Sequence, residues 1–590
     1  MSQGSRVAIA IFCVLLAAAG MFLPGLGWGL YRAEADAYLF GDQPPWAGEQ
    51  ILEAATPAEP AAEPAAEPAV GADVDANPLD ADAVVLNLNA DDAARAEIAR
   101  RYRLFTAQPD EMITLMSLAR MNPGELDLDP RLYQYGGLWI YPVGGLLKLA
   151  EVAGFITLTT DMAHYLNRPE DFARMYLVAR GYSAFFGLVG AIACFMLGWQ
   201  MTRSLLAAAG AGVGFCMLPA VVAMAHEAKP HLAGVALTLW AVWAAVRAIQ
   251  FSSKAWAAAA GALAGAAVGM VLTGVLALAV VPLVGLLGET SKNRRLKLIL
   301  LAGLCAAGVY GVSNPYVVKH AFASPVAAEA SPLGSNLGNT EAMYTPGRFA
   351  EGFRAATGYL IEATSPVLTL FAALAVVVGF FVWLLRDRSG VGVHASAATR
   401  RAALLLGIPV VLMLSVMVAV GAGKPAEFGR FALLPAAGLM LASVVGIYRL
   451  GLAGRLGVLA LTPAIVAAPF GMRYVNAFRA DAGPDNTRIA AAEVIETYRA
   501  AGAYAIELNA EPAPYSMPPV DLAAWELLLN RRPNEPAGAE LVVRPVDDPD
   551  TSTAVPGYRR EHVLARRQLT PITWASKPFE VWVRDDVSRP

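Results

Sequence analysis

Residues 204–250, SLLAAAGAGVGFCMLPAVVAMAHEAKPHLAGVALTLWAVWAAVRAIQ, contain two long apolar runs on either side of a polar hexapeptide. The runs cover 204–224 and 231–250. A bilayer core about 30 Å thick requires roughly 20 apolar residues per helix. Backbone polar groups in lipid must be satisfied within the segment, which favours helices. The stretch therefore predicts two membrane-spanning helices joined by a short polar loop.

The composition of the whole chain places it in the same class. Hydrophobic residues make up 56% of the sequence and charged residues 16%, with a mean hydropathy of +0.47. This composition has too few polar and charged residues to form the surface of a soluble globule, so we expect an integral membrane protein. The net charge of −4 is small and indicates no nucleic-acid partner. The four cysteines stand inside apolar runs without paired spacing, which predicts buried thiols and neither a disulfide framework nor a cysteine metal site.

Further apolar runs and the distribution of basic residues predict the number of spans. Clear runs occupy residues 7–30, 176–200, 297–318, 365–386, 402–421, 428–449 and 454–472. We interpret the first as a retained span because it is longer than a signal-peptide core. Short cytoplasmic loops carry an excess of lysine and arginine, so five groups should face the cytoplasm. They are Arg203; Lys254; Lys292, Arg294, Arg295 and Lys297; Arg386, Arg388, Arg400 and Arg401; and Arg449 and Arg455.

All five groups face one side only if residues 256–288 cross twice and residues 137–157 do not cross. The second segment contains Pro142, Lys148 and Glu151, which suits a helix at the outer surface. The expected fold is therefore mainly α, a polytopic transmembrane helical bundle of about eleven spans with an outer surface helix.

Four regions are predicted along the chain. Residues 1–30 form the first transmembrane helix. Residues 31–175 form an extracytoplasmic loop, in which about 54–95 is a disordered Ala/Glu/Pro insertion of low complexity. Residues 176–472 form the transmembrane bundle. Residues 473–590 lose the long apolar runs and contain strand-like pieces at 504–508 and 579–583, which predicts a small extracytoplasmic α/β domain.

Adjacent carboxylates in the first loop are the main candidates for catalysis. Asp110 and Glu111 follow Pro109 and precede apolar residues at helical spacing. Asp110 suits two roles: a helix N-cap, or a general base that takes a proton from an acceptor hydroxyl at the membrane boundary. Glu34 and Asp36, just after the first span, are second candidates for the same role.

Cations on other outer segments are candidates for binding an anion. The hexapeptide His226–His231 holds four ionisable groups, and charges so close to lipid are costly unless they snorkel or serve a function. Lys229 suits a phosphate as a point charge. Two histidines around a glutamate also suggest a metal site, but their spacing and Pro230 oppose one. Arg430 and Lys424 stand at the mouth of a late span, where an arginine either binds an anionic headgroup or snorkels. For Arg180, near the outer end of its span, a structural ion pair is expected.

The order of these motifs resembles the C-type (GT-C) superfamily of polytopic glycosyltransferases, especially bacterial relatives of protein mannosyltransferases and aminoarabinose transferases. The resemblance covers residues 1 to about 480 and rests on five motifs. They are Pro109–Glu111; the aromatic segment Tyr135–Pro142; the arginine-led span beginning at Arg180; the loop His226–His231; and Gly429–Pro435. Two features depart from the family pattern: the polar loop ends in His231 where an aspartate is common, and the long insertion separates the acid from the first span.

The resemblance implies a hexosyl- or pentosyltransferase in the cell inner membrane, with a polyprenyl-phosphate sugar as donor and its active site facing the non-cytoplasmic side. It implies Asp110, with Glu111, as the catalytic acidic motif. Lys229, Arg430, Lys424 and His226 would lie near the donor phosphate, and Asp36, Tyr135, Tyr141 and His231 are possible substrate contacts. The acceptor would be a glycan, lipid or protein. No cofactor or metal is implied, and assistance by a divalent cation remains open.

Two other functions fit a polytopic chain. A secondary transporter also uses about a dozen spans, but transporters tend to show internal repeats and ionisable residues at the bilayer midplane. No clear repeat is visible here, and the polar groups gather at the outer ends of spans. A non-catalytic scaffold that carries the tail as an interaction module is a third candidate.

Overall fold

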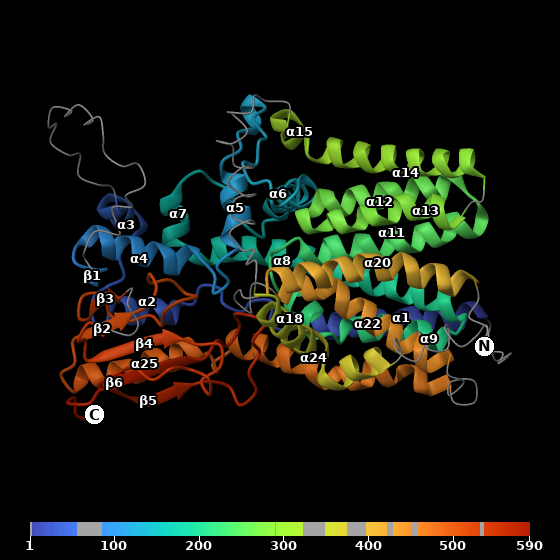
Figure 1. Cartoon of the computed structure of the whole chain (residues 1–590). Helices are drawn as coiled ribbons and strands as arrows, with labels where there is room; N and C mark the ends of the chain where they lie inside the picture. Colours follow the sequence, from blue (N-terminus) through green and yellow to red (C-terminus); the bar gives the residue numbers. More distant parts are fainter. Residues whose placement is uncertain are drawn as a thin grey trace, which may run out of the picture.

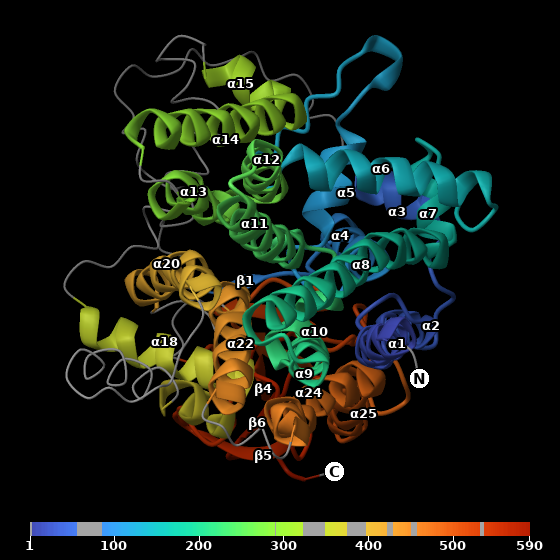
Figure 2. The ribbon, with the colours of Figure 1, turned by 90° about the vertical axis from the view of Figure 1, so that its right-hand side faces the viewer.

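The computed structural model describes residues 3–55, 85–288, 291–321, 348–374, 397–421, 429–449, 457–530 and 536–589. A helical bundle occupies one end of the molecule and a β-sheet domain the other (Figure 1). Figure 2 views the molecule from the bundle end that bears the N-terminus, so the strands lie behind the helices. The two ends of the chain lie at opposite ends of the molecule in Figure 1.

The bundle confirms the expected fold class. Its elements are α1 (Gln3–Phe22), α8 (Pro169–Thr202), α9 (Leu205–Cys216), α10 (Pro219–Ala225), α11 (His231–Phe251), α12 (Lys254–Met270), η2 (Leu272–Ala279), α13 (Val280–Gly288), α14 (Lys292–Ser313), α15 (Pro315–Ala321), α18 (Phe349–Thr364), α20 (Ala397–Ala419), η3 (Gly429–Ala432), α22 (Leu433–Arg449), η4 (Gly457–Leu461) and α24 (Thr462–Asp481). Within the described ranges, seven helices are long and apolar enough to cross a membrane, or nine if each of two bent pairs is one span.

The expected total of about eleven is higher because it counts two crossings within 256–288. The chain does fold there as two consecutive apolar segments, α12 and η2 with α13, but each is too short to be counted with the others. A Cβ atom at Gly261 or Gly265 of α12 would clash with the Ala302 or Ala306 carbonyl of α14. Such close approach at small residues is how membrane helices gain packing contacts.

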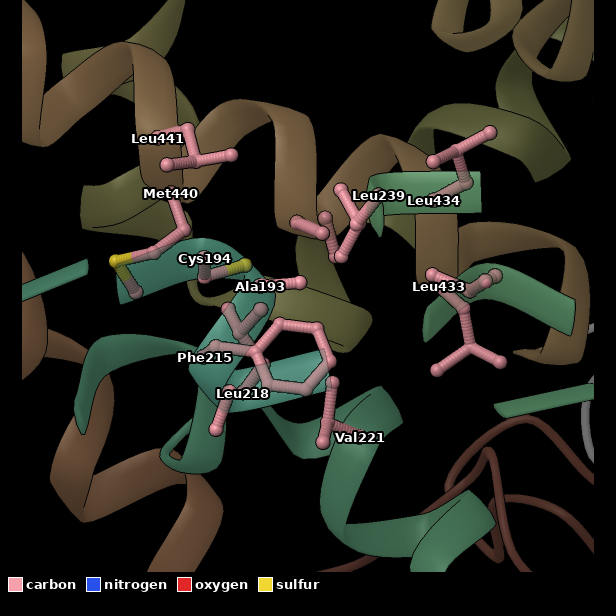
Figure 3. Close-up of a cluster of buried hydrophobic side chains, with 14 of the residues drawn as sticks. Ala193, Cys194, Phe215, Leu218, Val221, Leu239, Leu433, Leu434, Met440 and Leu441 are labelled. Atoms are coloured by element: carbon pink, nitrogen blue, oxygen red, sulfur yellow. The ribbon is translucent and has the colours of Figure 1, made fainter. Parts of the chain in front are cut away.

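Figure 3 shows the apolar centre of the bundle, where side chains from α8, α9, α11 and α22 interdigitate. Phe215 and Met440 are fully buried there, and a Cβ at Gly214 would lie 2.5 Å from the Met440 sulfur. All four cysteines are free; Cys194 and Cys216 are buried as expected, whereas Cys13 is exposed on α1. The thiols thus act as small packing groups, or face outward from the bundle.

The span expected at 204–224 is broken. α9 and α10 meet at an angle of 58°, and Pro219 begins the second piece. Because proline lacks an amide hydrogen, it starts a new helix more readily than it continues one. The short helix α10 then delivers the polar hexapeptide to the end of the bundle that faces the sheet.

Basic residues gather at the opposite end of the bundle. Arg449 donates hydrogen bonds to the Met201 carbonyl (2.6 Å) and to Thr399 (2.8 Å), which joins the ends of α22, α8 and α20. Arg294 donates to the Ser252 carbonyl (3.1 Å) and joins α14 to the α11–α12 turn. Two of the five expected cytoplasmic groups contribute an arginine to these contacts. Arg386, Arg388 and Arg455, and residues 375–386 of an expected span, lie outside the described residues.

The first loop folds mainly into helices at the end of the bundle nearer the sheet (Figure 1). Its elements are α2 (Ala33–Phe40), α3 (Gly48–Ala55), β1 (Val85–Asn87), α4 (Asp92–Leu104), α5 (Met112–Ala119), η1 (Pro123–Glu125), α6 (Gly137–Val152) and α7 (Met162–Asn167). In Figure 1, α6 is seen nearly along its axis while α12 and α14 run across the picture. The helix expected to lie at the surface therefore lies across the direction of the spans.

The predicted insertion is too long at its carboxyl end. Residues 85–95 are ordered, because β1 pairs with β3 (Leu86 opposite Leu529) and Asp91 caps α4 by accepting a hydrogen bond from the Ala94 amide. Residues 56–84 lie outside the described residues.

The C-terminal region forms the expected α/β unit. It contains α25 (Thr487–Ala500), β2 (Ala505–Leu508), β3 (Glu526–Asn530), β4 (Leu541–Pro545), β5 (Tyr558–Leu564) and β6 (Phe579–Arg584). The strand order is β1-β3-β2-β4-β6-β5, in which β2 runs parallel to β3 and β4 and the other pairs are antiparallel. Both strand-like pieces seen in the sequence are strands. The first loop adds an edge strand that the local sequence did not predict.

Candidate functional site

Asp110 and two cations from distant parts of the chain meet at the sheet-facing end of the bundle. The Lys229 Nζ lies 2.7 Å from Asp110 Oδ2, and an Arg430 guanidinium nitrogen lies 3.6 Å from the same oxygen. Lys229 is buried, whereas 27% of the Asp110 side chain is exposed. The Asp110 carboxylate is therefore accessible to solvent, and its two cationic partners are less exposed than it is.

The structure does not use Asp110 as a helix cap. The N-cap of α5 is Glu111, whose side chain makes no capping bond, and the Asp110 amide donates to the Gln108 side chain at 2.6 Å. Of the two roles considered for Asp110, a helix N-cap and a general base, the structure does not show the N-cap. Its carboxylate faces Lys229, which follows the α10 helix.

Glu111 lies in the interior and joins three segments. Arg180 donates to its two carboxylate oxygens at 2.8 and 2.6 Å, the Ala228 amide donates at 2.7 Å, and the Thr106 hydroxyl lies 2.7 Å away. Arg180 also donates to the Leu26 and Trp28 carbonyls at the end of α1. The expected structural ion pair of Arg180 is confirmed. With both oxygens engaged, Glu111 is placed to hold the first loop and the hexapeptide together rather than to accept a proton.

Glu227 is a buried carboxyl with an unusual environment. One oxygen lies 3.6 Å from Lys229 Nζ and 3.4 Å from the Gln108 amide nitrogen, and the other has no hydrogen-bond partner among the described residues. Burial raises the pKa of Glu227 to about 7, against the opposing charge of Lys229. The pKa of Lys229 is also raised: burial alone would lower it, but the carboxylates of Asp110 and Glu227 outweigh burial. Lys229 therefore remains charged while Glu227 titrates.

Replacing Glu227 with glutamine is expected to change how stability depends on pH. The pKa of Glu227 is about 7 in the folded chain and near 4.5 in an unfolded one, so the folded state binds more protons between these values. Wild-type stability should fall as pH rises through this window, and Glu227→Gln removes that contribution. Melting temperatures measured from pH 5 to 8 should show the variant gaining on the wild type. Exposed Glu125→Gln is the control; a constant Glu227→Gln difference across pH would contradict the assignment.

The two histidines of the hexapeptide differ in their surroundings. The His226 ring stacks on Phe478 (centroids 4.2 Å apart), and its nitrogens lie 2.8 and 3.0 Å from the Val222 and Pro24 carbonyls. Burial lowers the pKa of His226 to about 4, so the ring is neutral and faces backbone instead of a donor phosphate. His231 is buried beside Tyr135, and neither ring nitrogen has a hydrogen-bond partner in the described part of the chain.

The remaining sequence candidates are dispersed. Tyr135 is buried and within the electrostatic field of Lys229 and Asp110. Tyr141 lies elsewhere, and its hydroxyl donates to the Leu128 carbonyl at 3.2 Å. Asp36 is paired with Arg103 at 3.0 Å and accepts a bond from Tyr31, so its described contacts are structural. Lys424 lies outside the described residues.

Two residues of this site had no signal in the sequence. Gln108 binds both the Asp110 amide and Glu227, and Thr106 contacts Glu111. The bond from Gln108 to Glu227 joins residues 119 positions apart, whereas the other two bonds are local. Across the ranges that the structure describes, no group of three or more histidine, cysteine or acidic side chains is arranged to hold a metal ion.

Comparison with known proteins found similar solved structures but no matching family. No family model and no curated protein matches the chain. ArnT from Cupriavidus metallidurans, solved with undecaprenyl phosphate, is 14% identical with a TM-score of 0.41, over 84% of this chain and 97% of ArnT. The Archaeoglobus fulgidus oligosaccharyltransferase, in the apo form, is 13% identical with a TM-score of 0.37, over 73% of this chain and 63% of that one.

The oligosaccharyltransferase AglB from Archaeoglobus fulgidus, in complex with an inhibitory peptide and a dolichol-phosphate, is 12% identical with a TM-score of 0.36, over 70% of this chain and 58% of that one. The chain spans less than two thirds of the length of the archaeal enzyme. ArnT and AglB are membrane glycosyltransferases of the GT-C fold. The likeness of this chain to both is distant in sequence and in superposition.

Proposed function

We propose that this chain is a membrane glycosyltransferase that moves a sugar from a polyprenyl-phosphate donor to an acceptor hydroxyl on the non-cytoplasmic side. The observation that carries the proposal is the partly exposed Asp110 carboxylate held by Lys229 and Arg430. A general base must reach solvent or substrate, and a phosphate leaving group must meet fixed cations. This cluster provides both within one site.

In the proposed reaction, the acceptor oxygen attacks the anomeric carbon of the donor sugar while the bond to the phosphate oxygen breaks. Asp110 takes the acceptor proton, and the leaving polyprenyl phosphate carries the bonding electron pair. Lys229 and Arg430 stabilise the charge on that phosphate. In the described state the same cations bind Asp110, so arrival of the donor phosphate would compete for them and free the carboxylate for the acceptor.

The sidedness of the site is proposed from the charge distribution. The basic contacts of Arg449 and Arg294 lie at the bundle end away from the sheet. Positive residues favour the cytoplasmic side of a membrane, so the site and the sheet domain would face outward. A plasma membrane location, a hexosyl or pentosyl donor and a glycan, lipid or protein acceptor belong to the same proposal.

The direct test uses full-length protein in nanodiscs with a radiolabelled polyprenyl-phosphate sugar and a cell-envelope extract as acceptor. Labelled product and free polyprenyl phosphate should appear together, and mass spectrometry of envelope glycans and glycolipids from a deletion strain should show a missing sugar. The transporter alternative predicts instead that sealed proteoliposomes accumulate a solute without breaking a glycosidic bond. Accumulation without any transfer would reject the enzyme.

A further inference from the structure

Two loops of the C-terminal domain present one aromatic ring each. Every residue of 512–520 is buried except Tyr515, and every residue of 572–580 is buried except Trp574. The two rings approach each other edge to face, with centroids 6.4 Å apart and planes at 75°. A tyrosine or tryptophan that serves packing alone normally has its ring buried in the core. Two partly exposed rings on otherwise buried loops indicate a surface kept for a ligand.

A buried ion pair fixes both loops. Arg488 donates to the Pro514 carbonyl (2.6 Å), to the Trp574 carbonyl (2.9 Å) and to Asp481 (2.8 Å). Asp481 also accepts from the Ser576 amide at 2.6 Å. Asp481 is the last residue of α24, so the aromatic pair is held rigidly against the end of the bundle. Such preorganisation reduces the entropy that a binding site loses when its ligand arrives.

The loop that carries Trp574 contacts the segment that carries Arg430. Ile572 packs on η3, where a Cβ at Gly429 would lie 2.8 Å from the Ile572 Cβ, and the next residue is Arg430. Burial raises the pKa of Tyr515; Arg101 opposes this effect, while Glu511 and Asp110 add to it. The tyrosine ring is thus within electrostatic reach of Asp110, and the loop with the tryptophan contacts the segment of its cationic partner.

The chemistry of the tryptophan favours a ligand with hydroxyl groups. Its Nε1 is shielded from solvent and has no hydrogen-bond partner among the residues described. The Lys577 amine lies 4.9 Å from the ring centroid and steadies the indole from one side. A sugar offers an apolar face of C–H groups to an aromatic ring and hydroxyl oxygens to an N–H donor. A lipid chain would leave that donor unpaired, which is costly.

We propose that Tyr515 and Trp574 form a carbohydrate subsite that positions a sugar of the acceptor beside Asp110. The assignment of the bound sugar to the acceptor rests on the proposed function. Binding of a sugar to the two rings does not require the donor. It narrows the acceptor to a glycan or a glycolipid. A protein acceptor without sugar would not use these rings.

Saturation-transfer NMR tests the subsite on the full-length protein in a detergent without a sugar headgroup. The probes are the methyl glycosides of glucose, galactose, mannose and N-acetylglucosamine at millimolar concentration. At least one should bind the wild type, and Trp574→Ala and Tyr515→Ala should each weaken that binding about tenfold. Tyr515→Phe, which keeps the ring, should retain most of it. Tyr504→Ala, at a tyrosine 60% exposed in the same domain, is the control and should bind like the wild type.

Absence of binding to every glycoside, or equal binding by wild type and both alanine variants, would overturn the proposal. A second measurement tests for contact of Trp574 with lipid: the absolute tryptophan emission lost to brominated lipids in nanodiscs should be the same for wild type and Trp574→Phe. A difference would assign the ring to lipid and overturn the subsite. Binding of polyprenyl phosphate to the alanine variants reports their folding. If glycosides bind but neither the wild type nor any variant binds polyprenyl phosphate, the proposed function is wrong and the subsite is supported.

Discussion

Asp110→Asn is expected to lower the rate of sugar transfer by about 10²- to 10⁴-fold, the usual contribution of a general base. Asparagine keeps the shape of the side chain but cannot take the acceptor proton. The fold should survive, because Lys229 keeps a second carboxylate, Glu227, 3.6 Å away. Single-turnover transfer from a radiolabelled donor in nanodiscs measures the effect.

The matched control is Asp127→Asn, which removes a partly exposed carboxylate of the same loop that pairs with Arg131. It should transfer sugar like the wild type. If Asp110→Asn retains wild-type transfer, the base is another group and the proposed mechanism is wrong. A loss in both variants would point to a general effect of loop charge.

Arg180→Met is expected to destabilise the protein by about 3–5 kcal/mol, the cost of leaving one member of a buried ion pair without its partner. The Arg180 and Glu111 side chains are both fully buried, and methionine would leave the Glu111 carboxylate uncompensated. The Leu26 and Trp28 carbonyls would lose their donor as well. Thermal unfolding in detergent should show a large fall in melting temperature.

Arg174→Met on the same helix provides the comparison. Arg174 pairs with Asp171 at 2.9 Å, but 45% of its side chain is exposed, and exposed pairs contribute about 0–1 kcal/mol. The two variants should therefore differ clearly in melting temperature. Equal shifts would show that the Glu111–Arg180 pair does not hold the site together.

Local sequence predicted the bundle well because each span is recognised from its own apolar run. It failed where order depends on distant partners. Residues 85–95 were predicted to belong to the disordered insertion, yet β1 forms there because Leu86 pairs with Leu529 in the C-terminal domain. The break at Pro219 could have been expected from proline chemistry, but the 58° bend and the direction in which it carries the hexapeptide depend on packing.

The candidate site was predictable in its chemical groups but not in their pairing. Asp110 and Lys229 stand 119 residues apart, so only sidedness, inferred from the basic loops, suggested that they share one face. The sequence interpretation favoured Asp110 as the base but did not reveal that Glu111 is buried, because that depends on the Arg180 and Ala228 donors. The His226 ring lies between the Val222 carbonyl of α10 and the Pro24 carbonyl just after α1, a placement that composition cannot reveal.

The central claim is that Asp110 and the donor phosphate compete for the same cations. Equilibrium binding of polyprenyl phosphate without sugar to the full-length protein tests this most directly. Lys229→Met should weaken binding about tenfold to a hundredfold, as expected for loss of a charge-assisted bond, whereas Asp110→Asn should bind at least as tightly as wild type. Unchanged affinity in Lys229→Met, or weaker binding in Asp110→Asn, would contradict the shared site.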